Sequence, residues 1–308
     1  PLSNRKPVIR WSESTRGVFR ICERLYELER LIPGSDKEES WFFSRGHSFG
    51  KGVQTYLLTQ DMDKALYQAW LSYWPQLEDH KTGKVTQART LHALQCAKPA
   101  MDKLLEDYEV VSFKGMPAVE LGFKLNMADD FTYVGFIDLV IRNKQSGLYC
   151  VLEIKYTGSW LDPRAMFENT GQGTGYSIVL DRIAGQHTTE YGVLYFVCQD
   201  KEKEPKEMQF HTYEFKKTLK DRLDWFIGLG LDYEMHEKMR AINSFPKRGN
   251  ACIRFNKTCK HFGTCGITAG ERHKPWIQDP HEAAGRYQFV YDIQEIVEDH
   301  LQDRKSVV

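Results

Sequence analysis

The chain has 308 residues, of which 41% are hydrophobic, 13% aromatic and 27% charged. This composition is typical of a soluble globular protein and excludes a disordered or collagen-like chain. The 42 basic and 42 acidic residues cancel, so bulk charge does not indicate a nucleic-acid partner and any basic surface must be local. No apolar run approaches the roughly 20 residues of a membrane-spanning helix. Pro1 to Arg10 also lacks an apolar signal core, so we expect a cytoplasmic protein with no membrane partner.

The first third of the chain has a helical pattern. From Ser14 to about Leu105, apolar residues recur at steps of three and four positions, for example at Val18, Ile21 and Leu25. Glycines and prolines interrupt this pattern and divide it into several helices. We therefore expect a helical N-terminal lobe.

Short strand patterns follow the helical lobe. Three β-rich runs, Ala118 to Asn126, Tyr133 to Arg142 and Leu148 to Tyr156, are separated by polar turns and predict consecutive antiparallel strands. A helical stretch then opens at Pro163. The nearly continuous apolar run from Tyr191 to Cys198 is typical of a strand buried on both faces. The predicted order is therefore three strands, a helix and a strand.

The last third of the chain is mixed. Met208 to Phe215 alternates as a further strand, and Thr218 to Ile242 has a helical pattern. Ser244 to Thr268 is irregular and contains three cysteines. The pattern from Ala283 to Leu301 predicts a terminal helix.

The expected fold class is α/β, with a central mixed β-sheet flanked by helices. We expect three consecutive parts in one compact unit. Residues 1–107 form the helical lobe and contribute Cys22 and Gln54, residues 108–216 form the core, and residues 217–308 form a helical and cysteine-bearing region.

An acid and a base share one face of the strand from Leu148 to Tyr156. Because side chains alternate along a strand, Glu153 and Lys155 project to the same side, while the intervening Ile154 points into the core. Upstream, Asp138 is a lone carboxylate between two apolar residues of the preceding strand. Pairing of these two strands would bring Asp138 and Glu153 together.

This constellation suits phosphodiester hydrolysis, which needs a hard divalent cation to activate water and to neutralise charge on the phosphate. Asp138, Glu153 and the carbonyl oxygen of Ile154 offer ligands for Mg²⁺ or Mn²⁺. Lys155 would orient the attacking water and stabilise the transition state. Taken alone, the same residues also fit a surface acid and an exposed ion pair without a catalytic role.

The pattern Gly135-x-x-Asp138 followed by Glu153-x-Lys155 resembles the core signature of the PD-(D/E)XK nuclease superfamily. The resemblance is strongest to its RecB-like branch, which includes AddB, the CRISPR-associated RecB-like exonucleases and many phage nucleases. It implies a restriction-endonuclease-like core in which the two acids and the lysine are catalytic.

Two further motifs of this branch have counterparts in the chain. Gln172 and Tyr176 match a Gln-x3-Tyr motif, and they lie at i and i+4 on one helix face. The resemblance implies that both organise the site and contact DNA, while a buried Tyr beside an incidental Gln is the alternative. The Gly-x3-His motif, whose His binds the metal, is matched best by Gly50-Lys-Gly-Val-Gln54. Gln is a weaker ligand than His for manganese, which affects the expected metal preference. His47 lies seven residues before Gln54 and could face the same way on a helix, but the favoured interpretation is a helix-start or surface His.

Seven cysteines in an intracellular chain are expected to be reduced thiols rather than disulfides. Three of them lie in apolar or mixed segments and are expected to be ordinary interior residues: Cys96, Cys150 and Cys198.

The other four cysteines are placed for a metal centre. Cys252-x6-Cys259-x5-Cys265 gathers three thiols in one segment, and Cys22 is the fourth. A cubane iron–sulfur cluster needs four thiolates that converge, whereas zinc sites more often use two close pairs. The layout resembles the cluster-bearing RecB-like nucleases, and Cys22 with Tyr26 is similar to their Cys-x3-Tyr start. The resemblance implies a structural [4Fe-4S] cluster; a zinc site and unligated thiols remain alternatives.

A basic stretch near these cysteines is either a solvated face or a phosphate contact. Its members are Lys247, Arg248, Arg254, Lys257, Lys260, Arg272 and Lys274.

The resemblance extends from about Ser14 to Cys265 and implies a divalent-metal-dependent DNA exonuclease of bacterial or phage origin. Its expected setting is recombination, repair or phage DNA metabolism, with single-stranded DNA ends as one substrate class. The chain has no helicase P-loop, so any unwinding requires a partner such as a helicase or recombination protein. One alternative is a nuclease fold that binds DNA or protein without cutting it, scaffolded by the metal cluster. A zinc-dependent regulatory binding module is another.

Overall fold

The structure is a computed structural model. It describes residues 9–31, 41–73, 81–158, 164–185, 188–200, 208–254, 256–263, 265 and 280–293, without the side chains of 41–43 and 81–85. The chain forms two compact units that do not follow the three consecutive ranges proposed from the sequence. The central unit comprises Glu38–Leu121 and Phe136–Leu223, and the terminal unit comprises Pro1–Lys37, Gly122–Gly135 and Asp224–Val308.

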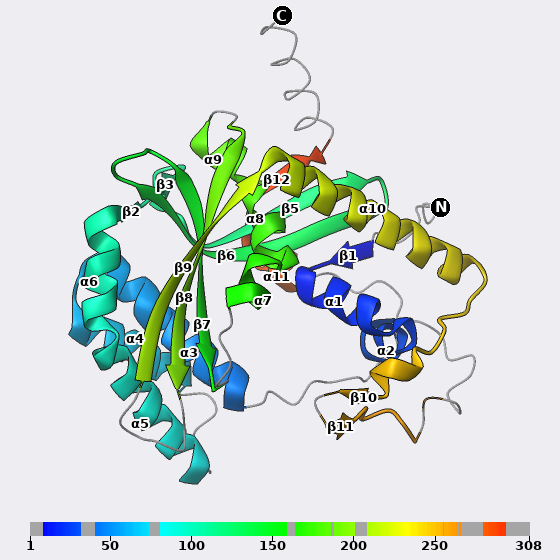
Figure 1. Ribbon diagram of the computed structural model, residues 1–308, viewed down its shortest axis with the longest axis horizontal. Helices are drawn as coiled ribbons and strands as arrows, with labels where there is room; N and C mark the ends of the chain where they lie inside the picture. Colours follow the sequence, from blue (N-terminus) through cyan, green and yellow to red (C-terminus); the bar gives the residue numbers. More distant parts are fainter. Residues whose placement is uncertain are drawn as a thin grey trace, which may run out of the picture. The chain divides into compact units, whose positions relative to one another are not determined.

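The central unit is built on a mixed sheet (Figure 1). Strand β6 (Phe131–Asn143) pairs antiparallel with β7 (Tyr149–Thr157), and β7 pairs parallel with β8 (Glu190–Asp200). Strand β9 (Met208–Thr218) then pairs antiparallel with β8. The predicted α/β class is confirmed, because this mixed sheet is flanked by helices.

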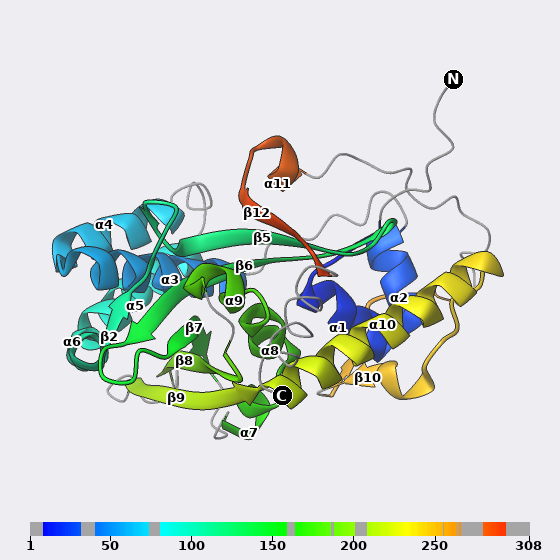
Figure 2. The same ribbon diagram turned by 90° about the horizontal axis from the view of Figure 1, so that it is seen from above.

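Helices cover both faces of this sheet in the central unit (Figure 2). One face packs against α3 (Trp41–Thr59) and its neighbours, and the other contacts the short helix α7 (Arg164–Glu168) through Phe167. Side chains of β8 alternate between the two cores, with Leu194 facing α3 and Tyr195 facing Phe167. The predicted strand buried on both faces is therefore confirmed.

The other elements of the central unit are short strands and helices. Strand β2 pairs antiparallel with the end of β6, and β3 and β4 form a hairpin. Their bounds are α4 (Met62–Tyr73), α5 (Lys81–Cys96), α6 (Lys98–Asp107), β2 (Tyr108–Val110), β3 (Ser112–Phe113), β4 (Met116–Pro117), α8 (Gly171–Ser177) and α9 (Leu180–Ala184). The predicted helical lobe corresponds to α3 to α6 together with the first helices of the terminal unit.

The terminal unit contains Gly122–Gly135, which includes most of β5 (Val119–Ala128) and the start of β6. Two more strands pair with these parts. Strand β1 (Ile9–Trp11) pairs parallel with β6, and β12 (Tyr287–Asp292) pairs parallel with β5. The terminal helix predicted from Ala283 is wrong over β12, because Tyr, Phe and Val alternate there with period two and the backbone pairs with β5. Residues 294–301 of that prediction lie outside the described residues.

Aromatic side chains form the interior of the terminal unit. Its elements are α1 (Glu13–Ile21), α2 (Glu23–Tyr26), the π-helix η1 (Glu27–Leu31), most of α10 (Leu219–Ala241), η3 (Gly249–Ala251), β10 (Ile253–Arg254), β11 (Lys257–Thr258) and α11 (Pro280–Ala283). Trp11, Phe19, Tyr26 and His236 pack against one another with ring centroids 5.0–6.0 Å apart. Trp11 also donates a hydrogen bond to the Tyr26 hydroxyl at 3.1 Å, so the N-terminal strand is tied to α2.

Among the described residues, no helix has the length and apolar character needed to cross a membrane.

Helix α3 approaches its neighbours most closely at Gly52. A Cβ placed there would lie 2.2 Å from a methyl carbon of Leu94 and 3.2 Å from Cβ of Ala69. Gly50, one half-turn earlier, has nothing within 4 Å of the same position. The close packing of α3 on α4 and α5 thus requires glycine at Gly52 and not at Gly50.

These two glycines form a matched pair for a stability test. We expect Gly50→Ala to stabilise the protein slightly, because alanine is favoured by up to about 1 kcal/mol over glycine inside a helix. We expect Gly52→Ala to destabilise it instead, since overpacking a core typically costs about 1–3 kcal/mol. Urea unfolding monitored by circular dichroism would measure both changes. A Gly52→Ala protein as stable as Gly50→Ala would contradict this close packing of α3.

Candidate active site

The acidic cluster of the central unit lies where β6 and β7 pair. The register sets Leu139 opposite Leu152, and continued by one residue it places Asp138 opposite Glu153. Oδ2 of Asp138 accepts a hydrogen bond from the backbone N–H of Ile154 at 2.8 Å. Glu153 is only 1% exposed, so the alternative of an exposed ion pair does not describe it.

Lys155 connects this cluster to helix α8. Its Nζ lies 2.8 Å from Oε2 of Glu153 and donates to Oε1 of Gln172 at 3.1 Å. Nε2 of Gln172 in turn lies 3.4 Å from the hydroxyl of Tyr176. The structure thus brings both residues of the Gln-x3-Tyr motif next to the acid and base of β7.

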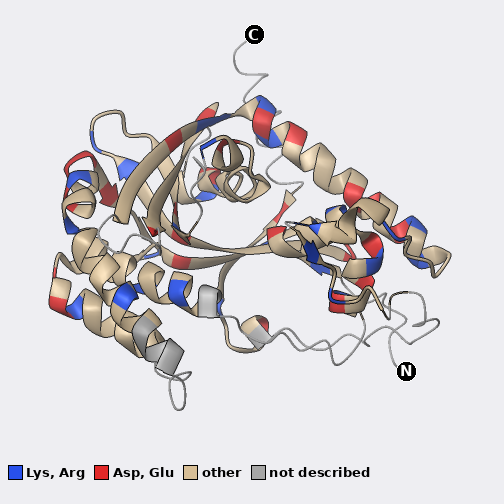
Figure 3. Ribbon diagram, turned by 60° about the horizontal axis from the view of Figure 1, so that its bottom comes forward, with Lys and Arg blue, Asp and Glu red and all other residues tan. Residues whose placement is uncertain are grey.

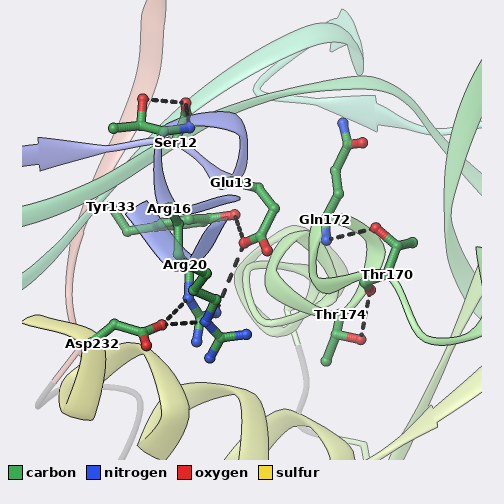
Figure 4. A network of polar contacts seen from close by, with 10 residues as sticks. Ser12, Glu13, Arg16, Arg20, Tyr133, Thr170, Gln172, Thr174 and Asp232 are labelled. Atoms are coloured by element: carbon green, nitrogen blue, oxygen red, sulfur yellow. Dashed lines mark hydrogen bonds and ion pairs between the residues drawn. The ribbon is translucent and has the colours of Figure 1, made fainter. Parts of the chain in front are cut away.

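Two features of α8 hold Gln172 in place. Thr170 caps the helix, because its hydroxyl accepts from the backbone N–H of Gln172 (Figure 4). Gly173 allows the helix to approach β8, since a Cβ there would lie 2.6 Å from Val193 and 2.7 Å from the Tyr195 hydroxyl.

Gln54 reaches the same cluster from α3. Its Nε2 donates to Oε1 of Glu120 at 2.8 Å and approaches the backbone oxygen of Asp138 at 3.4 Å. Gln54 is 3% exposed, whereas His47 of the same helix is exposed. Gln54 stands where the nucleases that the sequence resembles have His, and this side chain lies beside the acids.

Two buried oxygens of the cluster have no hydrogen-bond donor among the described residues. They are Oε1 of Gln54 and Oε1 of Glu153. A water molecule or a cation would satisfy both acceptors. Oxygen ligands from carboxylates and amides are those that Mg²⁺ and Mn²⁺ prefer.

Sequence reasoning missed Glu120, which borders the cluster from β5. Its backbone has φ +48°, an uncommon conformation for a residue with a side chain. The carboxylate accepts from Gln54 and lies 3.3 Å from Nζ of Lys51. By binding the amide nitrogen of Gln54, Glu120 leaves the amide oxygen available to a cation. The one sequence signal for Glu120 is a charged residue within an apolar strand.

The titration of the cluster reflects a shortage of positive charge. Burial raises the pKa of Glu153 to about 8, with Lys155 opposing the rise and Asp138 adding to it. Burial also raises the pKa of Asp138, although Lys155 and the N–H of Ile154 favour its ionised form. Burial lowers the pKa of Lys155, but the carboxylates of Glu153 and Asp138 raise it more. One lysine is shared by two acids, so a divalent cation would complete the charge balance.

The donor set of this cluster is mixed. Among the described residues, no group of three or more His, Cys, Asp or Glu side chains is arranged to hold a metal ion. The oxygen donors that the structure places in the cluster are the carboxylates of Asp138 and Glu153 and the amide oxygen of Gln54. Amide and carbonyl oxygens are ordinary ligands of magnesium, although they do not belong to His, Cys, Asp or Glu side chains.

The four cysteines proposed as a metal centre line one cavity of the terminal unit, about 100 Å³ in volume. Cys22 lies between α1 and α2, and its sulfur accepts from the backbone N–H of Arg248 at 3.4 Å. Cys259 donates through its backbone N–H to the carbonyl of Cys252 at 2.8 Å. Cys265 completes the set, and no disulfide joins the four.

Among the described residues, the four cysteines line this cavity without forming a group of three or more side chains arranged to hold a metal ion.

The remaining cysteines lie in the central unit. Cys150 and Cys198 are buried in its core, as expected. The prediction that Cys96 is an interior residue is wrong, because it is exposed near the end of α5, with its sulfur 3.6 Å from Nε2 of His92.

Comparison with known proteins gives likenesses among solved structures. No family model and no curated protein matches the chain. It is similar to a crystal structure from Eubacterium rectale described as a candidate exonuclease, with 14% identity over 86% of this chain and 90% of that one. The TM-score is 0.47.

We expect Gln54→His to change the metal preference of the acidic cluster. Imidazole is a better ligand than an amide oxygen for manganese, so Mn²⁺ should bind more tightly relative to Mg²⁺. Competition between the two ions, followed by the paramagnetic signal of free Mn²⁺, would measure the ratio. An unchanged ratio would remove Gln54 from the metal ligands.

Proposed function

We propose that the chain is a divalent-metal-dependent DNA nuclease of the PD-(D/E)XK type, with an acid cluster similar to the RecB-like branch. The main support is the pair of unsatisfied oxygens on Gln54 and Glu153, beside Asp138 and next to a partly exposed lysine. A divalent cation would satisfy both oxygens, and the Lys155 ammonium lies beside the same acids.

The proposed roles follow from position. Asp138, Glu153, the Ile154 carbonyl and the Gln54 amide oxygen would hold Mg²⁺ or Mn²⁺. The cation supplies Lewis-acid chemistry when bound, activating water and offsetting phosphate charge. Lys155, held by Glu153 and Gln172, would orient the water and stabilise the negative charge that develops as one P–O bond breaks.

The mode of cleavage, the substrate and the partner are proposed from the resemblance of the sequence motifs. We expect exonucleolytic action on DNA, with single-stranded ends as a substrate, and a helicase or recombination protein as a partner where duplexes must be opened. A nuclease fold that binds DNA without cutting it is the alternative. The presence of all three motif residues, Asp138, Glu153 and Lys155, argues against that alternative.

Digestion of end-labelled DNA tests this proposal. We expect Asp138→Asn, Glu153→Gln and Lys155→Ala each to lower single-turnover cleavage with Mg²⁺ or Mn²⁺ by about a hundredfold or more. DNA binding should be retained, because the substitutions remove ligands and a base rather than the binding surface. Single- and double-stranded substrates labelled at either end would also report polarity.

Glu109→Gln is the matched control, since Glu109 is an exposed acid of the central unit in a surface pair with Arg142. It should cut like the wild type. Full cleavage by all three site variants would refute the catalytic assignment, and a wild type that binds DNA without cutting it would favour the binding-module alternative.

A second proposal concerns the thiol-lined cavity. We propose that Cys22, Cys252, Cys259 and Cys265 hold a [4Fe-4S] cluster with a structural role, with zinc as the alternative occupant. The support is that four cysteines distant in the sequence line one cavity of the terminal unit. Binding there would join α1 and α2 to the segment after α10.

Single serine substitutions test this proposal. Cys22→Ser and Cys259→Ser should each abolish the visible absorbance and iron content of anaerobically purified protein and lower its melting temperature. Cys96→Ser serves as the control, because Cys96 is an exposed thiol outside the cavity. Iron that stays stoichiometric without Cys22 would rule out the four-thiol site, and zinc in place of iron would select the alternative.

A further inference from the structure

Basic and acidic residues are both scattered over the helices and strands (Figure 3), in keeping with a net charge of zero. A second cavity of the terminal unit is lined by basic residues without acidic ones. It has a volume of about 650 Å³, and four of its lining residues are basic while none is acidic: Arg20, Lys247, Arg248 and Arg254.

Two of these guanidinium groups are held by acids that do not line the cavity. Nε of Arg20 donates to Oδ2 of Asp232 at 2.7 Å (Figure 4), and Arg248 forms two hydrogen bonds with Glu23. A guanidinium has five N–H donors, so each retains donors for another partner. The acids therefore fix the orientation of Arg20 and Arg248 without placing a carboxylate in the cavity.

Lys247 and Arg254 add further positive charge to the lining. Both residues are exposed, so a ligand can reach them from solvent. A lysine on a flexible stem and three planar guanidinium groups match the charge and oxygen geometry of phosphate.

The shape and lining of the cavity bear on which anion fits it. The cavity is open to solvent rather than enclosed, so an extended polyanion can lie along it. No aromatic side chain lines the cavity among the described residues, so it provides no platform on which a base stacks. These features fit a sugar–phosphate backbone that is held without selection of base sequence.

We infer that this cavity, called the basic pocket, binds the phosphodiester backbone of DNA. The inference rests on the proposed function only in taking DNA as the substrate, and it adds a binding site that lies outside the acidic cluster. Lys247 and Arg248 also line the thiol-lined cavity, so the two cavities share a wall. A test must therefore separate lost phosphate contacts from damage to the thiol site.

The test is fluorescence anisotropy of labelled single strands of about 20 nucleotides with the full chain in EDTA, where metal-dependent cleavage does not occur. The variant is Lys247→Ala/Arg254→Ala, which leaves the ion-paired Arg20 and Arg248 in place. Lys64→Ala/Lys216→Ala is the control, because it removes two exposed lysines of the central unit. Lys247→Gln/Arg254→Gln repeats the test with side chains of more similar size.

We expect the pocket variants to bind about tenfold more weakly near 0.1 M salt, and equally so for strands of different sequence. The slope of log affinity against log salt should become shallower by about 1.4, since each phosphate contact to a single strand contributes about 0.7. The control should match the wild type, and all variants should keep the wild-type metal content and circular dichroism.

Wild-type affinity and salt slope in both pocket variants would overturn the inference. So would equal, pocket-dependent binding of polyglutamate, which would make the basic pocket a site for acidic peptides. Cleavage is measured separately: if Glu153→Gln cut DNA like the wild type, the catalytic assignment would fail while the anisotropy result stood. If the pocket variants bound normally but Glu153→Gln were inactive, only the basic pocket would be rejected.

Discussion

The candidate active site depends on two carboxylates that lie on neighbouring paired strands and share a single lysine. Asp138 and Glu153 face each other across β6 and β7, and Glu153 is almost fully buried. Burying an acid is costly unless a partner stabilises its charge. Lys155 serves both acids, and the remaining deficit appears as a raised pKa of Glu153 and as acceptors on Glu153 and Gln54 without donors among the described residues.

The surrounding elements keep this arrangement rigid. Leu152 and Ile154 anchor the opposite face of β7 in the core beneath α3, so Glu153 and Lys155 are held on the other face. Gly52 lets α3 approach α5 closely, which fixes the helix that presents Gln54. Glu120 then orients the Gln54 amide. The same packing that stabilises the central unit therefore sets the positions of the oxygen ligands.

Local periodicity explains why much of the candidate site was predictable from the sequence. The period of two along β7 places Glu153 and Lys155 together, and the helical i, i+4 spacing does the same for Gln172 and Tyr176. The three-strand, helix, strand order followed from turn residues and apolar runs. The spacing of the four cysteines predicted that they lie near one another, but sequence periodicity does not predict the cavity that they line.

The remaining features depend on tertiary context. Glu120 reaches Gln54 from a backbone conformation with positive φ, which a strand pattern does not predict. The helix predicted over Tyr287–Asp292 is wrong, because pairing with β5 makes this segment a strand. Cys96 was assigned to the interior by residue type alone, whereas its position on α5 exposes it. In each case the three-dimensional surroundings of the residue decided the outcome.

Direct measurement of metal binding tests the central claim most simply. Isothermal titration of Mn²⁺ into EDTA-dialysed wild type and Glu153→Gln should show one site on the wild type that is lost or greatly weakened in the variant. Equal Mn²⁺ binding by the two proteins, or none by the wild type, would contradict the assignment of the acidic cluster as a divalent-metal site.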